Sequence, residues 1–178
     1  MNSIYLVLGV ILALATLSFS AHADNKLLEV GVRGGASVQN EREDINQYEL
    51  FTTFKLPWQW QWPNSNWLLS TQQHARIGAL VSDDDDGFVV SIAMGLTLEK
   101  PGGRFGVDIG SGPTYISQDE FGPQDMGGNF QFTSHIRLRY KLTDHFSIGY
   151  RYHHISNAGI DRPNPGLDVQ SIDLSYWY

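Results

Sequence analysis

A histidine, a serine and an aspartate lie near one another toward the C-terminal end of the sequence, in the stretches HHISN and GLD. His154 and Ser156 are two positions apart, and residues at this spacing in a β-strand share one face. An imidazole placed there can take the proton of the serine hydroxyl as the hydroxyl attacks a carbonyl carbon. Asp168 is an acid that can orient the imidazole and stabilise its cation. These residue types predict a hydrolytic triad of Ser156, His154 and Asp168.

The loop SNAGIDRPNPGLD, residues 156–168, also contains groups that could complete an oxyanion hole. We expect the hydrogen-bond donors to come from Asn157, from Asn164 or from backbone amides around Gly159. The sequence has no cysteine, which excludes disulfides, thiol nucleophiles and thiolate metal sites. The hydrolytic hypothesis calls for no metal ion and no organic cofactor. A simpler interpretation stays open, because polar residues are also common where a strand gives way to a loop.

The elements that must position these residues are β-strands. Apolar and polar residues alternate with a period of two in segment after segment, separated by Gly, Pro, Asn and Asp. We expect eight strands, at about 27–38, 45–55, 66–81, 87–99, 103–117, 128–141, 145–156 and 167–178. These lengths suit tilted membrane strands, which need about 9–11 residues to cross the hydrocarbon.

The two faces of the expected strands differ in a way that favours a membrane barrel. In segment 128–141, apolar and aromatic residues from Phe130 to Tyr140 fall on one face, opposite Arg137 and Arg139. Such alternation predicts an all-β fold, an eight-stranded antiparallel transmembrane β-barrel with a polar interior. We expect the buried arginines to pair with acids such as Asp108 or Asp173. A soluble lipocalin-type barrel would have the opposite arrangement, with an apolar interior.

The same alternation places the candidate triad. Continuing the apolar face of segment 145–156 leads to His154 and Ser156, whereas His153 points into the barrel. Extending the apolar face of segment 167–178 backward leads to Gln170 and Asp168. The predicted triad therefore lies on the outer, lipid-facing wall, near one rim of the barrel.

The N-terminal sequence predicts export. Ile4 to Leu17 is almost wholly apolar, and Ala21-His22-Ala23 has the small residues of a cleavage site. We expect a signal peptide at 1–23, a single barrel domain at 24–178, and localisation in the bacterial outer membrane. The formal net charge of −7 argues against nucleic acid as a partner. The terminal SYWY resembles the aromatic ending that the barrel assembly machinery reads in outer-membrane proteins.

The connections between strands alternate in character. We expect the polar, acidic loops to face outward, and loops 40–46 and 117–128 are candidates to cover a substrate groove. The run Asp83 to Asp86 is predicted to be a solvated hairpin tip, since it lacks the spacing of a calcium loop. The long connection 55–66 carries Trp58, Trp60 and Trp62, which fit an interfacial aromatic girdle or, alternatively, a sugar-stacking platform.

The motif HISNAGI followed by PNPGLD resembles the lipid A 3-O-deacylase family, often called PagL, whose members are eight-stranded outer-membrane barrels. The resemblance implies a serine esterase that removes a 3-linked 3-hydroxyacyl chain from lipid A, with lipopolysaccharide as its substrate. By the same resemblance, His154 is the base, Ser156 is the nucleophile, and Asn157 and Asn164 shape the site or the oxyanion hole. This chain departs from the family at Asp168, where the usual residue is Glu, and Asp161 is an alternative acid.

Three rival functions remain open at this point. The first is a structural or lipopolysaccharide-binding small barrel without catalysis. The second is another lipid-modifying enzyme, such as a phospholipase or an acyltransferase. A porin is disfavoured, because side chains fill the interior of an eight-stranded barrel.

Overall fold

A computed structural model describes residues 26–38 and 44–178. The predicted signal peptide at 1–23 and most of loop 40–46 lie outside these residues. The strands are β1 (Leu27–Ser37), β2 (Asn46–Gln61), β3 (Leu68–Val81), β4 (Asp86–Glu99), β5 (Phe105–Ile116), β6 (Glu120–Phe121), β7 (Gln124–Asp125), β8 (Phe130–Lys141), β9 (Phe146–Ser156) and β10 (Leu167–Trp177). In this part of the chain, no helix is long and apolar enough to cross a membrane.

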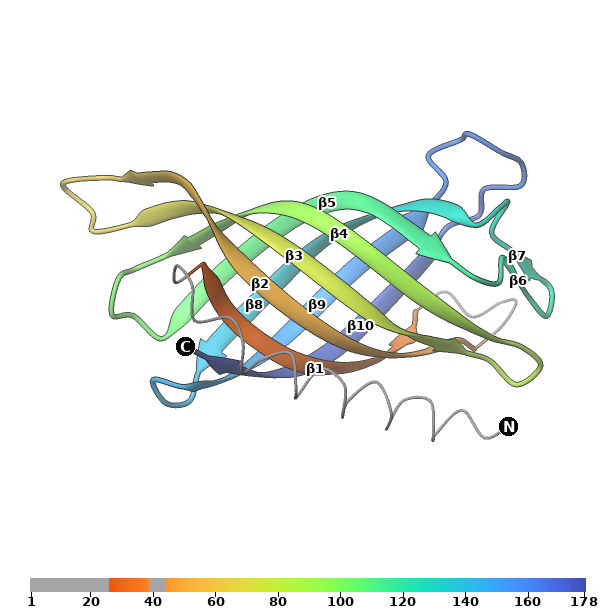
Figure 1. The fold of residues 1–178 in the computed structure, drawn as a ribbon, viewed down its shortest axis with the longest axis horizontal. Helices are drawn as coiled ribbons and strands as arrows, with labels where there is room; N and C mark the ends of the chain where they lie inside the picture. The colour runs from red at the N-terminus through yellow and green to blue at the C-terminus, as the bar shows by residue number, and fades with distance from the viewer. Residues whose placement is uncertain (1–25, 39–43) are drawn as a thin grey trace.

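Eight of the strands close into a barrel, in the order β1-β10-β9-β8-β5-β4-β3-β2, and every neighbouring pair is antiparallel. Closure joins the two ends of the domain, because β1 pairs with β10 and the Tyr178 amide donates to the Leu28 carbonyl at 3.1 Å. The start of β1 and the end of β10 therefore lie at the same end of the barrel (Figure 1). The predicted eight-stranded antiparallel barrel is confirmed.

The β2–β3 hairpin differs from the prediction. The sequence suggested that the strand ends near residue 55, but β2 continues to Gln61, with an irregularity in the pairing between Lys55 and Gln59. The prediction failed because Pro57 reads as a strand breaker, whereas a bulge next to it tolerates the missing amide donor. The hairpin projects at the barrel end where β1 starts and β10 ends (Figure 1). Trp58, Trp60 and Trp62 of this hairpin are exposed, and the hairpin lies at the barrel end opposite the C-terminal end of β9 (Figure 1).

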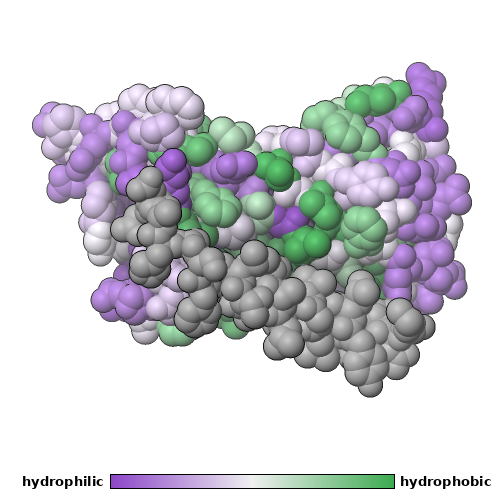
Figure 2. All heavy atoms as spheres, in the orientation of Figure 1, coloured by the Kyte–Doolittle hydropathy of each residue, from purple (hydrophilic) through white to green (hydrophobic). Residues whose placement is uncertain are grey.

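The outer wall is a band of apolar and aromatic side chains. On β8, β9 and β10 the exposed apolar and aromatic residues include Ile136, Leu138, Tyr140, Ile148, Tyr150, Tyr152, Ile172, Leu174 and Tyr176. Hydrophobic residues gather over the middle of the face in Figure 2, with hydrophilic residues toward both ends. The wall is therefore suited to contact with hydrocarbon, as the alternation predicted.

The interior is polar and ionic at mid-height. The Arg137 guanidinium donates to Glu29 at 2.6 Å and to Asp173 at 2.5 Å, and it lies 3.9 Å from Asp108. His153 is completely buried there. The predicted pairing of buried arginine with acids across the lumen is confirmed. Arg33, Arg76, Arg137 and Arg139 each form an ion pair with a carboxylate, which offsets the cost of burying their charges inside the barrel.

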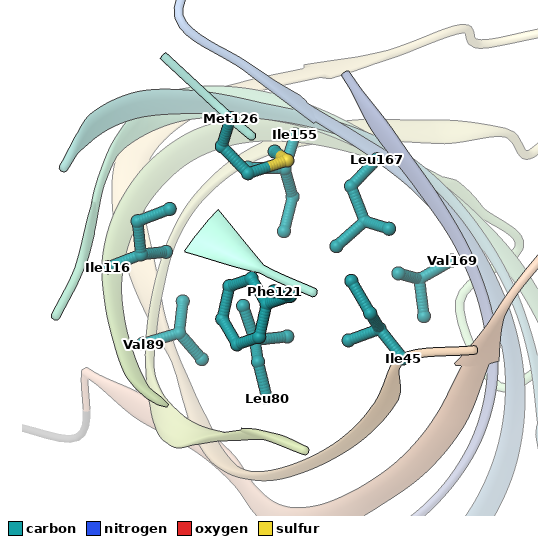
Figure 3. Close-up of a cluster of buried hydrophobic side chains, with 9 residues drawn as sticks. All are labelled: Ile45, Leu80, Val89, Ile116, Phe121, Met126, Ile155, Leu167 and Val169. Carbon is teal, nitrogen blue, oxygen red and sulfur yellow. The ribbon is translucent and has the colours of Figure 1, made fainter. Parts of the chain in front are cut away.

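An apolar cluster closes the interior at the end opposite the start of β1 and the end of β10. It consists of Ile45, Leu80, Val89, Ile116, Phe121, Met126, Ile155, Leu167 and Val169. Phe121 comes from the short β6–β7 hairpin, and its ring lies near the centre of the others (Figure 3). This hairpin lies within the predicted loop 117–128. The sequence did not predict it, since two-residue strands are too short to show a period.

Candidate active site

Strands β9 and β10 bring the predicted histidine and acid together. Their antiparallel register places Asp168 directly opposite His154, both on the outer face. The His154 Nδ1 and Asp168 Oδ1 atoms are 2.7 Å apart. The Asp168 side chain is 11% exposed and the His154 side chain 46% exposed, so the acid is sheltered while the imidazole faces outward. The aspartate is thus long enough to reach the imidazole, although it is one methylene shorter than the expected glutamate.

This contact fixes the chemistry that His154 has available. With Asp168 as a carboxylate, Nδ1 carries the proton and donates a hydrogen bond to Oδ1. The lone pair of Nε2 is then free to accept a proton on the exposed side of the ring. This is the orientation that a general base of a hydrolytic triad requires.

Ser156 lies on the same face of β9, half-buried, at the last position of the strand. Its register partner on β8 is Phe132. Among the described residues, no hydrogen bond joins its hydroxyl to His154. Two residues of strand advance the chain by about 6.6 Å, so rotation of both side chains toward each other has to close the gap. Such contacts often tighten only when substrate is bound.

Asn157 is buried, and its side chain holds two loops together. Its amide nitrogen donates to the carbonyls of Gly127 and Asp161, each at 3.0 Å, and lies 3.3 Å from the Pro163 carbonyl. Its Oδ1 atom accepts the Gly159 amide at 2.8 Å. The loop after β9 is thereby tied to itself and to the segment that follows β7.

The other predicted donors are placed differently. Asn164 is exposed, and its Oδ1 accepts the backbone amide of Asn157 at 3.2 Å, which leaves its NH₂ group pointing away from that bond. The Gly159 amide is engaged by Asn157, as described above. Asp161 is exposed, and the structure pairs Asp168, not Asp161, with the imidazole.

Gly166 supports His154, a contact that the sequence did not predict. A Cβ atom at this position would lie 2.5 Å from His154 Cε1, and the residue has a φ of +71°. The backbone therefore passes directly under the imidazole, where only glycine leaves enough room. The Pro-Gly pair in the PNPG motif was a signal of a tight turn, but the contact with the ring depends on tertiary structure.

The β6–β7 segment supports the same region. The Gln124 side chain donates to the Gly166 carbonyl at 3.0 Å, while Phe121 fills the barrel mouth. Segment 117–128 therefore contacts the candidate site from the lumen side and supports the turn at Gly166. Its predicted role as a cover for a substrate groove stays a prediction.

In the described part of the chain, His74, Asp108 and His135 are the group whose residue types suit a metal ion, with ligand atoms within 4.8 Å of one another. They lie inside the barrel, on the opposite side of the wall from His154. His135 Nε2 is 3.2 Å from Asp108, and His74 Nδ1 is 3.2 Å from Thr53. The same interior contains buried arginines, whose charge opposes a cation: Arg33, Arg76, Arg137, Arg139 and Arg151. We assign no metal to this cluster.

The barrel and the arrangement of His154, Asp168 and Ser156 define a class of protein. It is a small membrane-type barrel with a candidate hydrolytic site on its outer wall. A sequence profile of the family described as lipid A 3-O-deacylase (PagL) matches residues 46–177. Because this match spans most of the chain, the chain belongs to the lipid A 3-O-deacylase (PagL) family. The resemblance seen in the HISNAGI and PNPGLD motifs is confirmed.

Comparison with individual proteins agrees with this family assignment. The chain is 47% identical over 77 residues to the lipid A deacylase PagL of Bordetella bronchiseptica, a match that covers 43% of this chain and 42% of that protein. It is 27% identical over 135 residues to the lipid A deacylase PagL of Pseudomonas aeruginosa, covering 67% and 75% of the two chains. A crystal structure of the outer membrane enzyme PagL superimposes with a TM-score of 0.70 at 25% identity, covering 83% of this chain and 97% of that one.

Proposed function

We propose that this protein is an outer-membrane ester hydrolase that removes the 3-linked 3-hydroxyacyl chain from lipid A. Membership of the family supports the reaction and the substrate. The observation that carries the proposal to particular residues is the 2.7 Å contact between His154 and Asp168 on the outer wall, with Ser156 on the same face. A lipid that diffuses in the outer leaflet reaches such a site without leaving the membrane.

In the proposed first step, the Ser156 hydroxyl attacks the ester carbonyl carbon while His154 Nε2 takes its proton. Asp168 stabilises the imidazolium that results. Collapse of the tetrahedral intermediate breaks the bond to the sugar oxygen, which receives the proton from His154. The products of this step are the 3-hydroxyl of the lipid A sugar and an acyl-serine.

In the second step, a water molecule gives a proton to His154 and attacks the acyl-serine. The intermediate collapses to the free hydroxy acid and the restored Ser156. Water has access because the site lies at the rim, beside the exposed loop after β9. Each step uses only protein groups, substrate and water.

Among the predicted oxyanion donors, the NH₂ group of Asn164 is the one with no hydrogen bond to another described residue. The amide of Asn157 and the backbone amide of Gly159 are both used within the loop. We therefore infer that Asn164 donates to the oxyanion, and that Asn157 and Gly159 hold the loop in shape. Stabilisation of this kind is worth about 10²- to 10³-fold in kcat for one donor.

Mass spectrometry of lipid A from cells that express the protein tests the proposal. Wild-type protein should remove the mass of one hydroxyacyl chain, whereas Ser156→Ala and His154→Ala should not. Asp168→Asn should lower the rate by about 10²-fold or more, since it disturbs the tautomer and charge of the imidazole. Asp161→Asn is the matched control and should leave the rate unchanged.

The alternatives make different predictions in the same experiment. A gain in acyl mass would indicate an acyltransferase, and a changed phospholipid profile with intact lipid A would indicate a phospholipase. Folded wild-type protein that leaves lipid A unchanged would support a structural or lipopolysaccharide-binding barrel and contradict the proposal.

A further inference from the structure

Four polar residues form a row across the outer wall. The strand registers pair Ser111 of β5 with Ser134 of β8, Ser134 with His154 of β9, and His154 with Asp168 of β10. All four lie on outward-facing positions. On the side of His154 away from Asp168, the row therefore continues with Ser134 on β8 and Ser111 on β5.

The serine pair is unusual in its surroundings. Ser111 and Ser134 are exposed, and their Oγ atoms are 2.9 Å apart. On β8, Ser134 interrupts an apolar outward set, with Phe132 on one side and Ile136 on the other. On β5, the outward residue before Ser111 is Ile109. Polar groups on a lipid-facing wall are costly. Polar residues are common where a strand ends, but Ser111 and Ser134 lie within their strands, so their position calls for another explanation.

The pair retains hydrogen-bonding capacity. Each hydroxyl has one donor and two acceptor positions, and the bond between the two serines uses one donor and one acceptor. Among the described residues, no other hydrogen bond involves either side chain. One hydroxyl hydrogen and several lone pairs therefore remain available to a ligand beside His154.

We propose that the Ser111–Ser134 pair binds the hydroxyl on the acyl chain of the substrate, and so selects 3-hydroxyacyl over unsubstituted acyl esters. This inference rests on the proposed function. Neighbouring strands are about 4.8 Å apart, so an acyl chain that leaves the carbonyl near His154 and crosses onto β8 passes directly over Ser134. The chain hydroxyl lies only two carbons beyond the carbonyl carbon, within reach of the pair. The flanking Phe132 and Ile136 supply apolar contact for the rest of the chain.

The direction in which the acyl chain of the substrate leaves His154 follows from the residues on either side of this histidine. On the opposite side of His154 the row reaches Asp168, whose carboxylate is engaged by the imidazole and is largely buried. An apolar chain crossing there would separate these two groups or cover a charged group. The β8 and β5 side offers neutral hydroxyls instead.

The test compares two esters of equal chain length, with and without the 3-hydroxyl, dispersed in the same detergent. kcat/KM is measured for wild type, Ser134→Ala and Ser111→Ala. Wild type should favour the hydroxyacyl ester, and Ser134→Ala should reduce that preference by about 3- to 10-fold, the effect of one lost hydrogen bond. The decrease in kcat/KM should affect the hydroxyacyl ester alone. Ser134→Thr, which keeps a hydroxyl, should retain the preference of the wild type.

Thr71→Ala is the matched control, because Thr71 also carries a hydroxyl on the outer wall, but on β3. It should leave the preference unchanged. A preference that survives both serine variants would overturn the proposed role of the pair while leaving the esterase intact. Equal loss on both esters would also overturn it, since that result indicates general damage to the site. Wild type that cleaves neither ester would contradict the proposed function and this inference together.

Discussion

At the scale of single residues, the position of His154 depends on a partner on each side. Asp168 holds Nδ1 through a hydrogen bond, and Gly166 supports the ring from below. The first contact is electrostatic and sets the tautomer. The second is steric and sets where Nε2 points, which decides whether it can reach Ser156.

Gly166→Ala should therefore lower activity strongly by displacing the imidazole. The added Cβ would lie 2.5 Å from His154 Cε1, and a misplacement of about 1 Å near the reacting groups can cost about 10²-fold in rate. Gly159→Ala is the control, since Gly159 also has a positive φ, +80°, but nothing lies within 4 Å of its Cβ position. Both changes add backbone strain of about 1 kcal/mol. Ester hydrolysis by the two variants, with unfolding temperatures alongside, separates displacement from strain, and equal activity would show that the ring is not held by Gly166.

At the scale of elements, the loop after β9 and the segment around β7 form one unit. The Asn157 side chain joins them through the Gly127 carbonyl, and Gln124 joins them again through the Gly166 carbonyl. Phe121 anchors the same segment in the apolar cluster at the barrel mouth. Motion of either loop should therefore be transmitted to the turn that supports His154.

Asn157→Asp should loosen this unit. The carboxylate cannot donate, so the surrounding carbonyls lose their donor and face a negative charge, which should cost about 1–3 kcal/mol or more. We expect a lower unfolding temperature and faster proteolysis within 157–166, together with reduced activity. Asn164→Asp keeps the oxygen that accepts the Asn157 amide, so it should lose activity while retaining stability. Identical unfolding behaviour in the two variants would argue against Asn157 as the connecting residue.

At the scale of the whole molecule, the barrel is stabilised by an interior of paired charges and closed by an apolar cluster. Arg137 of β8 contacts acids on β1 and β10, and neither of these strands is hydrogen-bonded to β8 in the barrel. The ion pairs therefore link strands that do not share a hydrogen-bonded edge.

Arg137→Met should destabilise the barrel strongly. The change leaves Glu29 and Asp173 buried without their main partner, and breaking a buried pair in this way costs about 3–5 kcal/mol. Urea unfolding in detergent measures the effect. Arg104→Met, at an exposed position, should change the free energy of unfolding by less than about 0.5 kcal/mol. Equal stability of the two variants would mean that the interior charges contribute little to folding.

The sequence by itself determined the strands, their two faces and the character of the interior. Period-two alternation is a local property, so it identified the barrel strands and placed His154, Ser156 and Asp168 on the outer face. It failed at the end of β2, where a bulge next to Pro57 extends the strand, and at the β6–β7 hairpin, which is too short for a period.

Only the tertiary structure decided which residues meet. Register across a closed barrel depends on all the strands together, and it sets Asp168 opposite His154 and Ser134 on the other side of the same histidine. The contacts of Gly166 and Asn157 join segments whose approach no local pattern encodes. Alternation assigns a residue to a face, but packing and register choose its neighbours.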